Sequence, residues 1–143
     1  MSQLDDLYQS IILDHNKRPR NYGALPDATH QAEGYNPLCG DKVNVYLNIE
    51  NAVIRDIQFE SASCAICKAS ASIMAQELKG KNLSQALALQ EKVQLFISEE
   101  FVISDEDSDL VSLQGLRKFP ARINCATLPW NTFLNAVHAQ VEA

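Results

Sequence analysis

The first part of the chain has an apolar residue at every third or fourth position. Positions with this spacing share one face of an α-helix, so the pattern predicts an amphipathic helix from about Leu4 to Asn16. Pro19 and the turn-forming residues 21–23 then end the helix and begin a loop. The apolar positions are Leu4, Leu7, Tyr8, Ile11 and Ile12.

From Val43 onward the apolar positions alternate with polar ones, which is the two-residue period of a half-buried strand. A second such run follows after Glu50-Asn51, so the pattern predicts an antiparallel hairpin with its turn at these residues. A short third strand is predicted near Thr29–Tyr35. The alternating residues are Val43, Val45, Leu47 and Ile49 in the first strand and Val53, Ile54, Ile57 and Phe59 in the second.

The remainder of the chain predicts helices. A run of small residues from Cys67 to Ser72 leads into a helix that stops at Lys79-Gly80-Lys81, where glycine ends it and lysines favour its C-terminus. Asn82 or Ser84 begins another helix, which extends to about Ser98. A short helix at Leu110–Leu116 and a final one at Ala126–Val141 complete the pattern. The fold class is therefore α+β, with a small antiparallel sheet of about three strands packed with about five helices in a single domain, residues 1–143.

Composition and charge limit the classes of function that the chain can have. The 143 residues are 46% hydrophobic and 21% charged, as in ordinary globular domains. The net charge of −6 argues against binding to a phosphate backbone, because the only basic cluster is the short Lys17-Arg18-Pro19-Arg20. The acidic stretch Glu99–Asp109 is expected to be a solvated loop or helix start. We therefore expect no nucleic-acid partner.

The chain contains no run of 18 apolar residues, so no membrane-spanning helix is expected. Its first residues carry acids and lack the apolar segment of a signal peptide, which predicts a cytoplasmic protein. In a reducing compartment, four cysteines are not expected to form structural disulfides. Metal or sulfur chemistry is the better hypothesis for them.

Three of the cysteines occupy positions suited to a shared site. Cys39 lies in a loop flanked by proline and glycine, with Asp41 two residues later. Cys64 and Cys125 are predicted at or near helix N-termini, where the helix dipole favours a thiolate. Thiolates with a carboxylate suit tetrahedral zinc, so Cys39, Asp41, Cys64 and Cys125 are the candidate ligands. The alternative is that these cysteines are simply small buried apolar residues.

The sequence Cys64-Ala65-Ile66-Cys67 also has the CxxC spacing of a thiol–disulfide exchange protein. The predicted hairpin before it argues against the βαβ context of a thioredoxin-like fold. Cys67 is therefore a core residue, a spare thiol or an alternative ligand.

His15 and His138 are expected to support helix C-termini rather than catalysis, and His30 to lie in a loop. Nucleophile-elbow, Walker A and dinucleotide-binding motifs do not occur.

Taken together, these segments resemble the IscU-like (NifU N-terminal type) iron–sulfur cluster assembly proteins, and most closely the SufU type. The matching motifs cover nearly the whole chain. They are Leu7-Tyr8 through Asp14-His15, Pro19-Arg20-Asn21, Asn36-Pro37-Leu38-Cys39-Gly40-Asp41, Cys64-Ala65-Ile66, Ala69-Ser70-Ala71-Ser72, Lys79-Gly80-Lys81, and residues 118–130 with Asn124-Cys125 and Leu128-Pro129-Trp130.

The resemblance implies a more specific function. IscU proteins have a histidine directly before the last cysteine, whereas this chain has Asn124, and the segment near 100–116 is similar to a SufU-type insertion. The resemblance therefore implies a zinc-dependent sulfurtransferase that works with a pyridoxal-phosphate cysteine desulfurase of the SufS type. In that scheme a histidine of the desulfurase takes a zinc position and frees Cys39 to accept persulfide sulfur. Arg122 would orient the site or stabilise thiolate charge, and downstream iron–sulfur assembly proteins would receive the sulfur.

The chain departs from the family pattern at Ser63, where glycine is usual, at Cys67, where serine is usual, and at Asn124, where SufU-type proteins have lysine. Other functions remain open at this point. Cys39, Cys64 and Cys125 could instead hold a transient iron–sulfur cluster on a scaffold. The remaining alternatives are a thiol–disulfide protein that uses Cys64 and Cys67, and a structural zinc module that acts as an adaptor.

Overall fold

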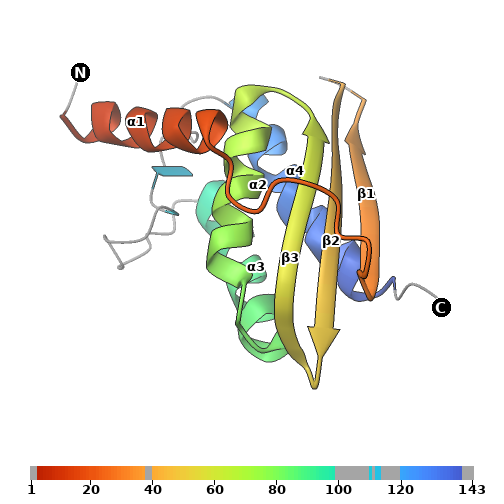
Figure 1. The fold of residues 1–143 in the computed structure, drawn as a ribbon. Helices are drawn as coiled ribbons and strands as arrows, with labels where there is room; N and C mark the ends of the chain where they lie inside the picture. Colours follow the sequence, from red (N-terminus) through yellow and green to blue (C-terminus); the bar gives the residue numbers. More distant parts are fainter. Residues whose placement is uncertain (1–2, 38–39, 99–109, 111, 114–119, 140–143) are drawn as a thin grey trace.

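The computed structural model describes residues 3–37, 40–98, 110, 112–113 and 120–139. Along the chain these residues form α1 (Gln3–Lys17), β1 (His30–Asn36), β2 (Asp41–Glu50), β3 (Val53–Ala62), α2 (Ala65–Leu78), α3 (Leu83–Ser98) and α4 (Pro120–Val137) (Figure 1).

The α+β class is confirmed, with four α-helices in the described ranges where about five were predicted. Of the short helix predicted at 110–116, the structure describes Leu110, Ser112 and Leu113, which are buried and have a 3₁₀ conformation. Most of the expected insertion near 100–116, and the acidic stretch Glu99–Asp109, lie outside the described residues.

The three strands form one antiparallel sheet in the order β1-β2-β3. The predicted hairpin and the third strand are both confirmed. Asn51 and Ala52 connect β2 to β3 and both have positive φ, 53° and 62°. Positive φ at both central residues is the geometry of a type I′ turn, whose twist matches that of the flanking strands.

Replacing Ala52 with glycine is expected to raise the free energy of unfolding by up to about 1 kcal/mol. Alanine has a Cβ that crowds the backbone at positive φ, and glycine relieves this strain at some entropic cost. Asn51→Gly is the matched control and should gain less, because asparagine tolerates this conformation. Urea unfolding of the three proteins measures the difference, and an equal or larger gain at Asn51 would contradict the assignment of strain to Ala52.

Helices α2 and α4 cover one face of the sheet, and α1 packs on α2 (Figure 1). Helix α4 packs on β1 and β2, α2 packs on β3 and on α4, and α3 packs on α4. Alternate residues of β2 are therefore fully buried under the helices, as the period-2 pattern predicted. The largest fully buried side chains are Trp130, Phe59, Phe133, Leu47, Ile54, Ile57, Ile73, Met74, Leu78, Ile97 and Leu113.

The boundaries of the last helix differ from the prediction of Ala126–Val141. Helix α4 begins at Pro120 and ends at Val137. Proline is well suited to the first helical position because its missing N–H has no partner there. At the other end, the carbonyl of Ala139 accepts a hydrogen bond from the Gln31 N–H at 3.2 Å, so the chain joins the edge of β1 instead of continuing the helix.

His15 lies in the last turn of α1, as predicted, and it also contacts another helix. Its side chain is 1% exposed, and Nδ1 lies 2.7 Å from the Ser72 hydroxyl of α2. The same hydroxyl accepts the backbone N–H of Arg20 at 2.8 Å. Ser72 therefore attaches α1 and the following loop to α2.

Within the described residues, no helix combines the length and apolar character needed to cross a membrane.

Candidate metal centre

Asp41 is the first residue of β2 and closes the loop that joins β1 to β2. It pairs with Asn36 in the sheet, and the Gly40 N–H donates to the Asn36 carbonyl at 2.8 Å. Gly40 has φ +74°, a conformation that favours glycine. The Asp41 side chain is directed inward and is 2% exposed. Cys39, the remaining candidate ligand in this loop, lies outside the described residues.

Cys64 is the N-cap of α2, which confirms its predicted place at a helix N-terminus. Its backbone N–H donates to Asp41 Oδ1 at 2.8 Å, and its Sγ lies 3.4 Å from Asp41 Oδ2. Cys64 Sγ in turn accepts the backbone N–H of Cys67 at 3.4 Å. One side chain therefore caps the helix and contacts the carboxylate, while staying only half-buried.

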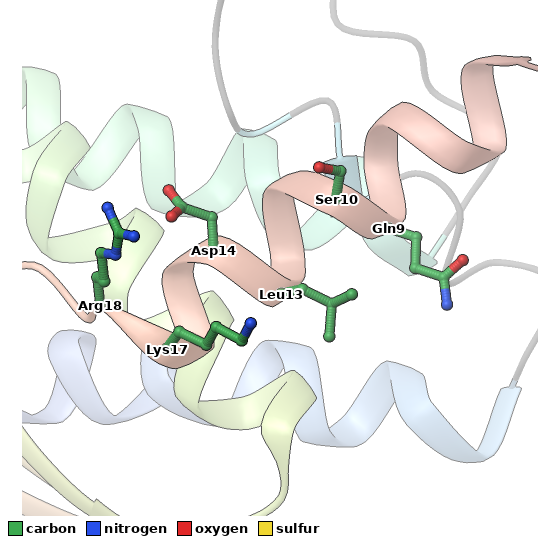
Figure 2. A pocket seen from close by; sticks show the side chains of 6 residues that line it. All are labelled: Gln9, Ser10, Leu13, Asp14, Lys17 and Arg18. Carbon is green, nitrogen blue, oxygen red and sulfur yellow. The ribbon is translucent and has the colours of Figure 1, made fainter.

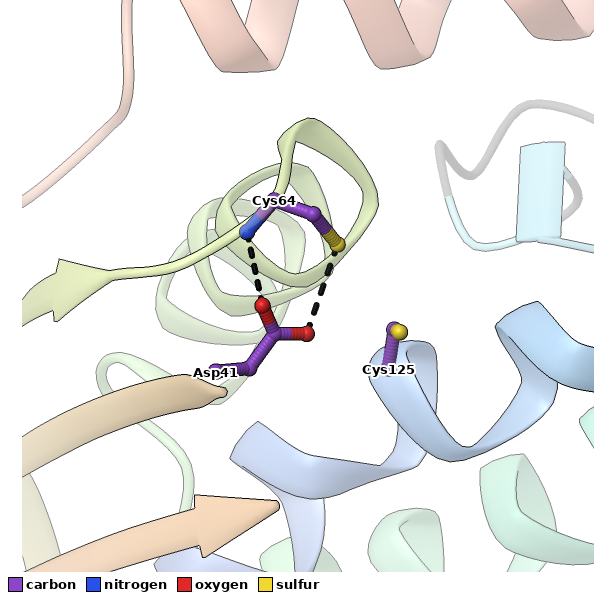
Figure 3. A group of neighbouring side chains, drawn as sticks. All are labelled: Asp41, Cys64 and Cys125. Carbon is purple, nitrogen blue, oxygen red and sulfur yellow. Dashed lines mark hydrogen bonds between the residues drawn. The ribbon is translucent and has the colours of Figure 1, made fainter. Parts of the chain in front are cut away.

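Cys125 completes a group of three (Figure 3). The prediction placed it just before the last helix, but α4 begins at Pro120 and Cys125 lies in its second turn, 1% exposed. The helix dipole argument therefore does not apply to this cysteine, because the dipole acts within the first turn. Its Sγ, Cys64 Sγ and an Asp41 oxygen all lie within 4.8 Å of one another.

The chemistry and spacing of this group fit zinc. Four donors around tetrahedral zinc lie about 3.3–3.8 Å apart, given bonds of about 2.0–2.3 Å. The 3.4 Å between Cys64 Sγ and Asp41 Oδ2 is within that range, and the 4.8 Å limit on the other pairs requires only small side-chain shifts. The structure thus brings together three of the four predicted ligands, and their assignment as ligands remains a prediction.

A buried hydrogen-bond network holds Cys125 beside Cys64. The Ser70 hydroxyl of α2 donates to the Ala126 carbonyl of α4 at 2.6 Å and accepts the Trp130 indole N–H at 3.1 Å. Pro129 lies inside α4 and has no N–H to donate to the carbonyl of Cys125, four residues earlier. Ser70 therefore adds a hydrogen bond to α4 at Ala126, directly after the carbonyl that receives no backbone N–H from Pro129.

Replacing Ser70 with alanine is expected to destabilise the protein by about 1–3 kcal/mol, because the buried indole N–H loses its acceptor and the Ala126 carbonyl loses the hydroxyl that joins it to α2. It should also weaken zinc binding, since Cys125 is one residue from Ala126. Ser72→Ala is the matched control: the two serines are on one helix, are both fully buried and both link helices, but Ser72 contacts His15 and Arg20.

Urea unfolding and zinc competition measure the two effects. Trp130 is the only tryptophan in the chain, so its fluorescence reports the change at Ser70 directly. Both alanine variants should lose stability, but only Ser70→Ala should shift the tryptophan emission and lower the zinc affinity. Equal loss of zinc affinity in the two variants would contradict a specific link between Ser70 and the site.

Two further sequence positions do not enter this group. Arg122 is on α4 one turn before Cys125, with an exposed side chain, and its predicted supporting role remains a prediction. Cys67 is fully buried and is not part of the three-residue group. The role of Ser70 was not predicted from the sequence, where it is one of two serines in the run from Cys67 to Ser72 and local pattern does not distinguish them.

A surface hollow of about 480 Å³ lies elsewhere, along α1 (Figure 2). Its lining residues belong to α1 or follow it directly, and none is a candidate metal ligand. Arg20 donates to Asp14 at its edge and holds the pKa of that exposed carboxyl below its usual value. The lining residues are Gln9, Ser10, Leu13, Asp14, Lys17 and Arg18.

Comparison with known proteins gives consistent matches along the chain. The family model described as the NifU-like N terminal domain matches residues 7–138. The chain is 39% identical over 137 residues to the zinc-dependent sulfurtransferase SufU of Bacillus subtilis (strain 168), covering 95% of this chain and 92% of that protein. It is 34% identical over 144 residues to the iron-sulfur cluster assembly scaffold protein IscU of Streptococcus pyogenes serotype M1, covering 100% and 90%.

The fold is similar to a solved structure as well. The crystal structure of the N-terminal part of a nitrogen-fixing NifU-like protein from Brucella abortus superposes with a TM-score of 0.85. The two sequences are 25% identical, and the match covers 96% of each chain.

Proposed function

The chain belongs to the NifU-like N-terminal domain family, the IscU-like proteins of iron–sulfur cluster assembly, and on that premise we propose that it is a zinc-dependent sulfur acceptor. It would take persulfide sulfur from a pyridoxal-phosphate cysteine desulfurase in the cytoplasm and pass it to downstream iron–sulfur assembly proteins. The similarity to the zinc-dependent sulfurtransferase of Bacillus subtilis supports this choice.

The single observation that carries the proposal is the carboxylate in the donor group. Asp41 lies within 4.8 Å of both cysteine sulfurs and accepts the Cys64 N–H, which orients it. Iron–sulfur clusters are held mainly by cysteine thiolates, whereas zinc accepts oxygen and sulfur ligands together. A buried carboxylate between two thiols therefore favours zinc.

The chain's own residues would divide the work. Asp41, Cys64 and Cys125 would hold zinc together with Cys39, and zinc when bound keeps the thiols deprotonated. Asp41 pairs with Asn36 in the sheet and accepts the Cys64 N–H, so it can stay in place when Cys39 leaves to react. Cys39 Sγ would then attack the terminal sulfur of the desulfurase persulfide: one S–S bond breaks, another forms, and the desulfurase cysteine departs as a thiolate.

Access to the site is consistent with this reaction. Asp41 and Cys125 are almost fully buried, while Cys64 is half-buried and the neighbouring Gly40 and Pro37 are exposed. A partner would therefore approach from the side of the loop between β1 and β2. Arg122, exposed on α4 one turn before Cys125, would place a positive charge near this approach.

A cluster scaffold is the second proposed function, supported by the full-length similarity to the scaffold protein IscU of Streptococcus pyogenes. In that case Cys39, Cys64 and Cys125 would hold a transient cluster. Metal and acid-labile sulfide analysis of untagged protein purified without oxygen separates the two. About one zinc per chain without iron or sulfide supports sulfur transfer, whereas stoichiometric iron and sulfide would support the scaffold.

Cys39→Ala is expected to abolish sulfur uptake, because it removes the proposed acceptor thiol. The assay supplies a SufS-type desulfurase with isotope-labelled cysteine and follows labelled sulfur on the intact protein by mass spectrometry. Cys67→Ala is the matched control, since Cys67 lies outside the metal group and should not affect uptake. Full labelling of the Cys39 variant would show that another residue accepts the sulfur.

A further inference from the structure

Cys67 has no part in the proposed metal centre or in sulfur transfer. It is fully buried in the first turn of α2, three residues after Cys64. None of the three cysteines in the described residues is in a disulfide. We propose that Cys64 and Cys67 form a redox-active dithiol that is oxidised by low-molecular-weight disulfides.

The local geometry favours a bond between these two thiols. Cys64 Sγ accepts the Cys67 backbone N–H at 3.4 Å, so this sulfur already lies against the residue with which it would bond. The Cα–Cβ bond of a helical residue is tilted toward the helix N-terminus, and Cys67 Cβ is therefore tilted toward the N-cap. One helical turn separates the two Cα atoms by about 5 Å, inside the disulfide range of about 4.4–6.8 Å.

The difference in exposure gives the two thiols different tasks. Cys64 is half-buried and can be reached by a small molecule, whereas Cys67 is fully buried beneath it, with its backbone N–H 3.4 Å from Cys64 Sγ. Cys64 Sγ would attack the small disulfide, forming a mixed disulfide and releasing one small thiol. Cys67 Sγ would then attack the sulfur of Cys64 and release the second small thiol.

The reaction balances without another reactant. The protein dithiol loses two electrons and two protons, and the small disulfide gains them as it becomes two thiols. Cys125 competes for Cys64 because its sulfur lies within 4.8 Å, but it is on another helix and is 1% exposed. A bond to Cys125 would have to join α2 to α4, whereas a bond to Cys67 stays within one turn of α2.

Oxidation would also change the metal group. The metal group has three donors in the described residues, Asp41, Cys64 and Cys125. A Cys64–Cys67 disulfide removes Cys64 from it. Zinc binding and dithiol oxidation would therefore exclude each other. The dithiol itself does not rest on the proposed function, because Cys64 and Cys67 are adjacent whether or not a metal is bound.

The test treats reduced, metal-free full-length protein with oxidised glutathione under anaerobic conditions. Intact mass, thiol alkylation and peptide mapping identify the product. The wild-type protein should lose two alkylatable thiols, show a Cys64–Cys67 bridge and recover both thiols with dithiothreitol. Cys67→Ser should instead accumulate glutathione on Cys64. Cys67→Ala should give the same product, and it replaces the serine variant if the serine hydroxyl perturbs the buried position.

The proposal is overturned if the wild-type protein keeps the mixed disulfide as the variants do, or if the bridge joins Cys64 to Cys125 or Cys39. A parallel sample loaded with zinc should release its zinc as the bridge forms, measured with a chromogenic chelator. Protein that fails to bind zinc at all would contradict the proposed function. The mass measurements on metal-free protein would still show whether Cys64 and Cys67 form a disulfide.

Discussion

Replacing Cys64 with serine is expected to lower the zinc affinity by about 100-fold or more, since loss of even an outer-shell partner of a metal site costs about 10–100-fold. Serine removes the soft sulfur donor but keeps an oxygen that accepts the Cys67 N–H. Serine is also a preferred N-cap residue, so α2 should remain as stable as in the parent protein. The substitution therefore separates the metal role of Cys64 from its capping role.

Zinc competition against a chromogenic chelator measures the affinity, and circular dichroism with urea unfolding of the metal-free protein measures the helix. Cys67→Ser is the matched control, because it makes the same change three residues later, outside the metal group. It should bind zinc as tightly as the parent. Unchanged zinc affinity in Cys64→Ser would remove Cys64 from the ligand set.

Replacing Gly34 with alanine is expected to destabilise the protein by about 2–3 kcal/mol or more through overpacking. Gly34 lies on β1 where α4 crosses it. A Cβ added at Gly34 would overlap the Thr132 hydroxyl and would come within 3.2 Å of Leu128. The Thr132 hydroxyl donates to the Leu128 carbonyl at 2.8 Å, so it cannot move away without breaking that hydrogen bond.

A double-mutant cycle with Thr132→Ala tests this contact. Removing the hydroxyl should relieve the closest overlap, so Gly34→Ala should cost much less in the Thr132→Ala background. Thermal and urea unfolding give the four free energies of unfolding. Additive effects would show that the cost comes from β1 itself rather than from its contact with α4.

Local pattern was sufficient for the elements of the fold. The two-residue alternation around Val43–Phe59 predicted β2 and β3. Helical spacing before Pro19 predicted α1, a run of small residues with a glycine stop predicted α2, and a capping residue predicted α3. Asn82, proposed as a cap, accepts the Gln85 N–H at 2.8 Å at the start of α3. Each of these features depends on residues within one or two turns of each other, so the sequence contains them directly.

The start of α4 has a local signal, proline at the first helical position, but the continuation of the helix through Pro129 was not predictable in the same way. Pro129 within α4 interrupts the backbone ladder, and Ser70 from α2 supports the helix there. Ser70 is 56 residues from Ala126 and 60 from Trp130, and nothing in the local pattern joins them. Cys125 lies in the second turn because α4 begins at Pro120, and Ser70 joins the neighbouring Ala126 and Trp130 to α2.

The fold class, the strands and the residue types that suit zinc and sulfur chemistry could be read from the sequence, because periodicity and ligand chemistry are local properties. That Asp41, Cys64 and Cys125 meet, that Cys67 stays outside their group and that His15 contacts Ser72 became known only from the folded structure. These contacts join residues far apart along the chain. Their geometry depends on how α2 and α4 pack on the sheet, and that packing minimises buried unpaired polar groups and voids over the whole domain.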